Sequence, residues 1–147
     1  MDTKIFVTTF KEYKVEAEKF YQACNRKAQI ELDDTLIVAL ENEKLAGIVR
    51  LCFEQGVFVL RTMQIHPDFQ RKGIGSLIFK KFDEVLKERE IKKIFCMPYE
   101  HLEGFYGQIG FLKIPASEAP SFLQQRLADF RPKAAAEKAI LMKRILK

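Results

Sequence analysis

Residues 64–76 constrain the fold more than any other stretch of this chain, and they read Gln-Ile-His-Pro-Asp-Phe-Gln-Arg-Lys-Gly-Ile-Gly-Ser. They follow an apolar, strand-like run and lead directly into an amphipathic helix. Pro67 ends the strand, because a proline cannot donate to a sheet ladder. Gly73 and Gly75 have no Cβ, so the backbone can approach a ligand closely at both positions. The stretch therefore predicts a strand, a loop and a helix start in direct succession.

The start of this helix predicts a phosphate-binding site. Amide N–H groups at a helix N-terminus lack intrahelical partners, and they attract anions through hydrogen bonds and the helix dipole. Arg71 and Lys72 add positive charge at the same place. We expect a pyrophosphate to bind the amides of six successive residues, which are Arg71, Lys72, Gly73, Ile74, Gly75 and Ser76.

Two common phosphate-binding motifs do not fit the stretch. A dinucleotide fingerprint needs a third glycine, and Ile78 occupies that position. A P-loop needs Gly-Lys-Ser/Thr after four intervening residues, and the chain has no such run. An ordinary strand-to-helix turn that happens to contain two glycines remains the structural alternative at this point.

The rest of the chain alternates between strand-like and helix-like patterns. Strands are predicted at residues 4–8, 35–40, 44–53, 57–65, 91–97, 111–114 and 138–146. Helices are predicted from Thr9 onward and at residues 76–90, 99–108 and 119–130. The second and third strands form an antiparallel hairpin, and the strand over 91–97 is expected to lie parallel beside that over 57–65.

Composition limits the classes of function. The 147 residues carry a net charge of +5, and 48% of them are hydrophobic, which predicts one folded domain over residues 1–147. The basic residues are interleaved with acids rather than gathered in one stripe, so nucleic acid is not the expected partner. No apolar run approaches membrane-spanning length. Three widely spaced cysteines, Cys24, Cys52 and Cys96, favour buried thiols in the cytoplasm over disulfides or a metal site.

A second motif lies downstream and reads Phe-Tyr-Gly-Gln-Ile-Gly-Phe over residues 105–111. With the Gln-x-x-Gly-x-Gly pattern at residues 70–75, it resembles the two signature motifs of the GNAT acetyltransferase superfamily. The predicted order of strands and helices over residues 4–146 also resembles that family. The resemblance implies an α+β fold with a central mixed, mostly antiparallel sheet, in which the fourth and fifth strands splay apart between flanking helices.

The resemblance further implies acetyl-CoA as co-substrate and no metal. Its pantetheine arm would lie between the splayed strands and pair with backbone near Met63, Gln64 and Ile65 like an added strand. Gln70 occupies the glutamine position of the motif, where a structural role in holding the loop competes with ligand contact. The pyrophosphate would bind the amides of residues 71–76.

The implied reaction is direct attack of a neutral amine on the thioester carbon. The family's motif places Tyr106 near the sulfur, where it would act as general acid toward the departing thiolate. A buried tyrosine that only packs under the cofactor is the structural alternative. The fourth strand offers no glutamate for the base, and four other residues are candidates by neighbourhood only: Glu54, Glu100, His101 and Glu103.

The acceptor is expected to be a small molecule with a primary amine. Residues 115–133 are predicted to border its site, as a lid, as core packing or as a contact in a homodimer, and four residues there are candidate contacts: Phe122, Gln124, Gln125 and Arg126. Two other functions stay open. The chain could acetylate protein N-termini or lysines, or it could be a non-catalytic regulator that binds an acyl-CoA.

Overall fold

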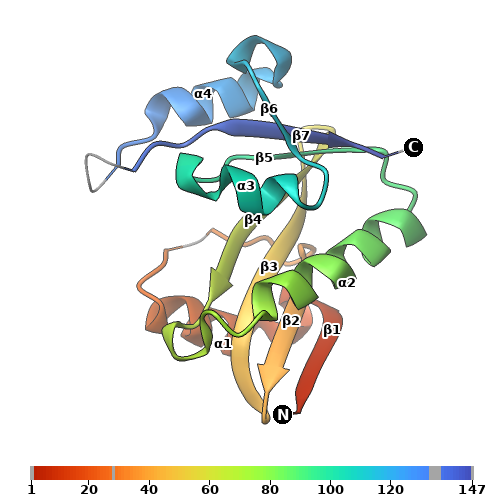
Figure 1. The fold of residues 1–147 in the computed structure, drawn as a ribbon, viewed down its shortest axis with the longest axis vertical. Coiled ribbons are helices and arrows are strands. Elements are labelled where there is room, and N and C mark those ends of the chain that lie inside the picture. The colour runs from red at the N-terminus through yellow and green to blue at the C-terminus, as the bar shows by residue number, and fades with distance from the viewer. Residues whose placement is uncertain (1, 28, 133–136, 147) are drawn as a thin grey trace. The chain divides into compact units, whose positions relative to one another are not determined.

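The computed structural model describes residues 2–27, 29–132 and 137–146, and Figure 1 shows the arrangement of their helices and strands. The strands are β1 (Thr3–Thr9), β2 (Thr35–Glu41), β3 (Lys44–Glu54), β4 (Val57–Ile65), β5 (Lys93–Cys96), β6 (Leu112–Ile114) and β7 (Leu141–Ile145). The α-helices are α1 (Phe10–Ala23), α2 (Ile74–Glu88), α3 (Glu103–Gly107) and α4 (Ser121–Asp129). Three short 3₁₀ turns are η1 (Pro67–Phe69), η2 (Glu100–Leu102) and η3 (Ala116–Glu118).

The strands form a mixed sheet in the order β1-β2-β3-β4-β5-β7-β6. The predicted hairpin is confirmed, since β2 and β3 pair antiparallel, and β1 pairs antiparallel with β2. By its internal contacts the chain forms two compact units. The first unit comprises Met1–Cys52 and Leu60–Arg89, and the second comprises Phe53–Val59 and Glu90–Lys147, so β4 contributes residues to both.

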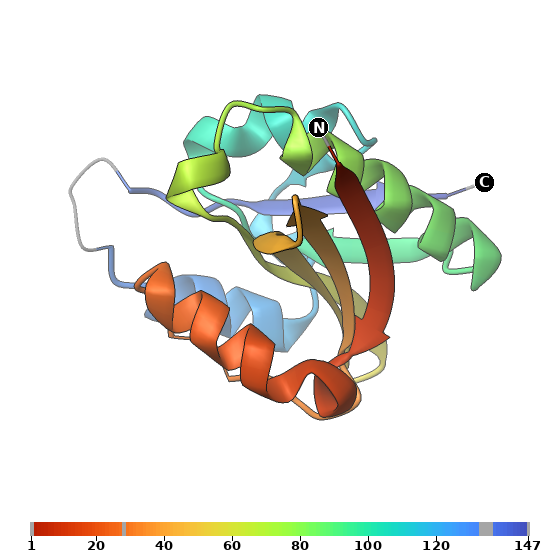
Figure 2. The same ribbon diagram turned by 90° about the horizontal axis from the view of Figure 1, so that it is seen from below.

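In the first unit, α1 and α2 cover opposite faces of β1, β2 and β3 (Figures 1 and 2). Thr9 is the N-cap of helix α1, and its side chain accepts a hydrogen bond from the amide of Glu12. The apolar stripe of α1 packs on one side of the strands through buried residues, which are Phe10, Ala17, Phe20 and Tyr21 against Leu36, Val38 and Ile48. The helix α2 likewise buries a stripe of apolar residues, which includes Ile78, Phe82 and Leu86.

Gly47 in β3 lies where no larger residue fits. A Cβ at this position would be 2.7 Å from Ile65 Cδ1, 2.8 Å from Ile78 Cδ1 and 3.3 Å from the carbonyl oxygen of Gln64. We expect Gly47→Ala to lower the free energy of unfolding by about 1–3 kcal/mol, because overpacking forces side chains and backbone to shift. Urea denaturation would measure this loss. Gly104→Ala is the control, since a Cβ there meets nothing within 4 Å; equal stability of the two variants would contradict the expectation.

In the second unit, β7 pairs antiparallel with both β5 and β6. The helices α3 and α4 lie on opposite faces of these strands (Figures 1 and 2). The face under α4 is a buried apolar cluster formed by Val59, Phe95, Ala119, Leu123 and Leu141. The β3–β4 turn also belongs to this unit.

The order of elements follows the sequence prediction, but several boundaries differ. The helix predicted at 99–108 is a 3₁₀ turn followed by the short α3, because Gly104 and Gly107 weaken an α-helix. The helix predicted at 76–90 begins two residues earlier, at Ile74. The strands predicted at 91–97 and 138–146 shorten to Lys93–Cys96 and Leu141–Ile145. The predicted splay of the fourth and fifth strands stays a prediction.

None of the three cysteines, all of which lie in the described part of the chain, forms a disulfide. Cys52 and Cys96 are buried, whereas Cys24 is half-buried. Burial raises the pKa of the Cys96 thiol well above its ordinary value, so this thiol stays protonated and unreactive. Within the described ranges, no helix combines the length and the apolar character that crossing a membrane requires.

Candidate functional site

The predicted phosphate loop connects β4 to α2 within the first unit. The chain leaves β4 at Ile65 and makes the η1 turn, where the Nδ1 atom of His66 accepts a hydrogen bond from the amide of Asp68 at 3.1 Å. Two glutamine side chains hold the end of the strand: Gln64 Nε2 donates to the carbonyl oxygen of Ile65 at 2.8 Å, and Gln70 Nε2 donates to the same oxygen at 3.3 Å. Gln70 therefore makes a hydrogen bond that can hold the loop, and its predicted contact with the cofactor stays a prediction.

The loop ends in two residues with left-handed backbone. Arg71 has φ +64° and Gly73 has φ +78°, and Gly73 is the N-cap of α2. Only Gly73 of the two motif glycines has this conformation, whereas Gly75 lies in the first turn of the helix. The amide of Leu77 makes the first intrahelical bond, to the Gly73 carbonyl at 3.2 Å. A Cβ on Gly73 would meet no atom of the described residues within 4 Å, so the space beside it is open with respect to them.

These features suit a phosphate group. The first-turn amides of a helix have no acceptor within the helix, and its dipole favours an anion at this end. Both neighbouring cationic residues are exposed. The ammonium of Lys72 lies 5.5 Å from the ring centroid of Phe69, a cation–π contact that holds its charge beside the loop. The residues present therefore fit the polyanionic pyrophosphate of a coenzyme A.

The end of β4 is tied to α1 by side chains that the sequence did not single out. Tyr21 is 2% exposed and donates its hydroxyl to the carbonyl oxygen of Thr62 at 2.9 Å. Burial raises the pKa of Tyr21 despite the charges of Arg50 and Arg26, so the hydroxyl remains a donor. Arg26 donates to the Met63 carbonyl oxygen at 3.2 Å and to Gln64 Oε1 at 3.0 Å. Contacts from residues of the first unit therefore hold the end of β4, including Met63 and Gln64, just before the loop.

Tyr106 lies on α3, in the second unit, and its side chain is buried at 5% exposure. Its ring makes edge-to-face contacts with Phe105, at 5.8 Å between centroids, and with Phe111, at 6.1 Å. Gly110 has φ +91°, and this left-handed glycine turns the chain from α3 into Phe111. The motif over residues 105–111 therefore builds an aromatic setting around the tyrosine ring.

The segment predicted to border the acceptor site forms η3 and α4, and Lys133 at its end lies outside the described residues. The polar residues predicted to contact the acceptor make hydrogen bonds to other residues of the second unit. Gln124 donates to the Ala119 carbonyl at 2.7 Å and Gln125 donates to Asp129 at 2.9 Å. Arg126 donates to both carboxylate oxygens of Glu54, at 2.8 and 3.4 Å. With Leu123 fully buried, this segment packs against the second unit's core.

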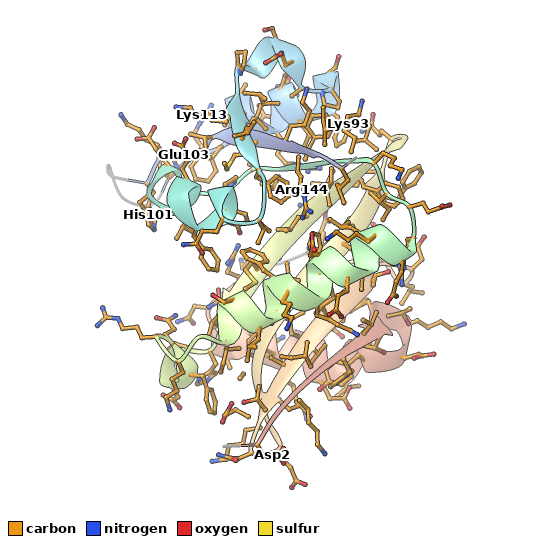
Figure 3. All side chains as sticks on the ribbon, turned by 45° about the vertical axis from the view of Figure 1, so that its right-hand side comes forward. Asp2, Lys93, His101, Glu103, Lys113 and Arg144 are labelled. Carbon is orange, nitrogen blue, oxygen red and sulfur yellow. The ribbon has the colours of Figure 1, made fainter. Side chains whose placement is uncertain are left out.

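Three of the four candidate bases are either paired with another residue or exposed. The carboxylate of Glu54 is paired with Arg126 at 2.8 Å. His101 stacks on Tyr99 with 5.8 Å between ring centroids. His101 on η2 and Glu103 on α3 are exposed, and Figure 3 labels both side chains.

Comparison with known proteins gives a consistent result. A family model described as an acetyltransferase (GNAT) domain matches residues 7–121. A curated relative from Pyropia yezoensis, named uncharacterized N-acetyltransferase ycf52, is 30% identical over 97 residues, which is 61% of this chain and 56% of the relative. A second ycf52 relative, from Porphyra purpurea, is matched over 42% of its length. The chain therefore spans about half the length of the curated relatives it matches.

Solved structures agree on the fold. An acetyltransferase of the GNAT family from Staphylococcus aureus superposes with a TM-score of 0.68 at 19% identity, and the match covers 98% of this chain and all of that one. N-acetylglutamate synthase from Neisseria gonorrhoeae, complexed with coenzyme A and N-acetyl-glutamate, gives 0.71 at 11% identity and covers all of this chain and 36% of the synthase. The mixed seven-stranded sheet is that of the acyl-CoA N-acyltransferases.

Proposed function

The chain belongs to the GNAT acetyltransferase family, and on that basis we propose that it transfers the acetyl group of acetyl-CoA to a primary amine of a small-molecule acceptor. One observation carries the proposal: β4 leads through a left-handed Gly73 into the first turn of α2, with Arg71 and Lys72 beside it. This arrangement occurs at the positions that match the family's acetyl-CoA motif. Residues 1–147 would act as a single cytoplasmic N-acetyltransferase domain, alone or as a homodimer.

On the donor side, two parts of acetyl-CoA, the pyrophosphate and the pantetheine arm, have proposed counterparts in the first unit. The amides from Arg71 to Ser76 would bind the pyrophosphate. Backbone groups of Met63 and Ile65 would pair with the pantetheine amides as an added strand would. Gln64 and Gln70 would act indirectly, because both donate to the Ile65 carbonyl and so hold the strand end in place.

Acetyl-CoA supplies an acetyl group that is activated as a thioester. The amine attacks the carbonyl carbon, so a C–N bond forms and the C–S bond breaks. Tyr106 donates its phenolic proton to the departing thiolate and regains one from solvent. A backbone N–H group at the end of β4 would stabilise the negative charge that develops on the carbonyl oxygen.

The proton lost by the amine goes to an ordered water or to bulk solvent in this proposal. Glu54 is held by Arg126, and His101 and Glu103 are exposed on the short helices. A mechanism without a protein base requires the acceptor to bind as a neutral amine. We therefore expect the rate to rise with pH until the acceptor's own amine is deprotonated.

The acceptor class is tested by incubating the protein with acetyl-CoA and a panel of amines, and by measuring the free thiol of released CoA. We expect release with small primary amines such as amino acids, polyamines or aminoglycosides, and the acetylated product by mass spectrometry. Activity confined to protein N-termini or lysines would contradict the small-molecule acceptor. A tight acetyl-CoA complex that turns over no amine or peptide would instead identify a non-catalytic acyl-CoA-binding regulator.

A further inference from the structure

Thr62 is a strained residue in the middle of β4. Its φ is +50°, in the left-handed region, although it lies inside a strand. A β-branched residue with positive φ is an outlier, because its side chain crowds the backbone there. Such a conformation persists only where the surrounding structure enforces it.

Three donors enforce the backbone at this point. Arg50 Nη1 donates to Thr62 Oγ1 at 2.8 Å, and Tyr21 donates to the Thr62 carbonyl oxygen at 2.9 Å. Arg26 Nη1 donates to the next carbonyl oxygen, that of Met63, at 3.2 Å. The donors come from β3, from α1 and from the segment after α1, so all belong to the first unit. Together they fix the direction of two successive peptide groups.

Arg50 is the buried centre of this network. It is 1% exposed, and its Nη2 atom donates to Asp34 Oδ2 at 2.9 Å and to the Gln29 carbonyl oxygen at 2.8 Å. Asp34 is 5% exposed and also accepts from the amide of Glu31 at 3.0 Å. A buried ion pair adds little net stability compared with apolar residues of similar size. What this pair supplies is a guanidinium that is held in one orientation toward Thr62.

We propose that Arg50, held by Asp34, is a positioning residue that fixes β4 at Thr62 and so presents Met63 to Ile65 to the pantetheine arm of the acyl-CoA. Removal of the guanidinium lets the strained residue relax toward ordinary extended backbone. A relaxed Thr62 turns the following peptide groups away from the direction that an added strand requires. The inference rests on the proposed function, because it names the device that shapes the donor site.

The test separates positioning from stability by removing both charges together. Arg50→Met alone leaves Asp34 buried without its partner and is expected to unfold easily. The double variant Arg50→Met/Asp34→Asn carries neither charge and keeps an acceptor for the Glu31 amide. We expect its thermal unfolding temperature to stay near that of the wild type. Its dissociation constant for coenzyme A, measured by calorimetry, should rise by about tenfold, the loss of one or two hydrogen bonds.

Two further variants show whether the effect runs through Thr62. Thr62→Val keeps the shape of the side chain but removes the oxygen that accepts from Arg50, and it should weaken coenzyme A binding to a similar degree. The triple variant, which adds Thr62→Val to Arg50→Met/Asp34→Asn, should bind coenzyme A no more weakly than the double variant. The reason is that Thr62→Val and Arg50→Met each remove the same hydrogen bond between Arg50 and Thr62. Arg89→Met is the matched control: Arg89 donates to another threonine hydroxyl, that of Thr35, at 2.8 Å, and its loss should leave affinity unchanged.

A second readout needs no ligand. Amide hydrogen exchange at residues 62–65 of the ligand-free protein should be faster in the double variant than in the wild type and unchanged in Arg89→Met. Wild-type affinity and exchange in a folded double variant would overturn the positioning role while leaving the proposed function intact. A wild-type protein that does not bind coenzyme A would overturn the proposed function, and the inference with it.

Discussion

Replacement of Tyr106 by phenylalanine is expected to lower kcat by about 10²-fold or more, the usual contribution of a positioned general acid. The KM for acetyl-CoA should change little. The phenylalanine ring keeps the edge-to-face contacts with Phe105 and Phe111 that hold the tyrosine ring in place. Only the hydroxyl is lost, so a large fall in turnover with unchanged affinity isolates proton donation to the thiolate.

The measurement is steady-state release of CoA with the best amine from the acceptor panel, together with coenzyme A affinity by calorimetry. Tyr13→Phe is the matched control, because Tyr13 lies on α1, half-buried, with its ring 5.7 Å from that of Phe6. This control should retain wild-type turnover. Wild-type turnover in Tyr106→Phe would leave that tyrosine as a packing residue and would assign the thiolate's proton to solvent.

The elements that local chemistry specifies were predictable from the sequence. Runs of apolar and β-branched residues identified the strands, and Val57–Ile65 matches its predicted bounds because Gly56 and Pro67 flank it. Prediction was less accurate where local signals conflict. The pattern at 99–108 suggested a longer helix than α3, since periodicity does not show how far two glycines shorten it. The two motif glycines suggested equal roles, but only Gly73 requires left-handed backbone.

The network around Thr62 could not be predicted, for a physical reason. A threonine in an apolar run has high β propensity, so its sequence favours an ordinary strand residue. Its left-handed conformation is imposed by contacts 12 and 41 residues away in the chain, from Arg50 and Tyr21. Arg50 itself gives no sign in the sequence of being buried, because its burial depends on the position of Asp34 in the fold.

Replacement of Gly73 by valine is expected to weaken coenzyme A binding by about 10- to 100-fold, which corresponds to the loss of one charge-assisted hydrogen bond. Gly73 has φ +78°, a conformation that a β-branched residue resists. Valine therefore drives the loop out of the left-handed turn and moves the first-turn amides of α2 away from the pyrophosphate. Its side chain would also extend into the space that is open beside Gly73.

Gly56→Val provides the control for backbone strain. Gly56 has φ +85° and, like Gly73, has no atom within 4 Å of a Cβ built on it, but it lies in the turn between β3 and β4. Both variants should therefore lose similar stability in thermal unfolding, while only Gly73→Val should lose affinity for coenzyme A. Equal affinities for coenzyme A in the two folded variants would show that the loop is not part of the donor site. A loss of coenzyme A affinity confined to Gly73→Val would place the pyrophosphate at the left-handed N-cap of α2. Backbone strain could not explain that difference, because both valine variants carry it.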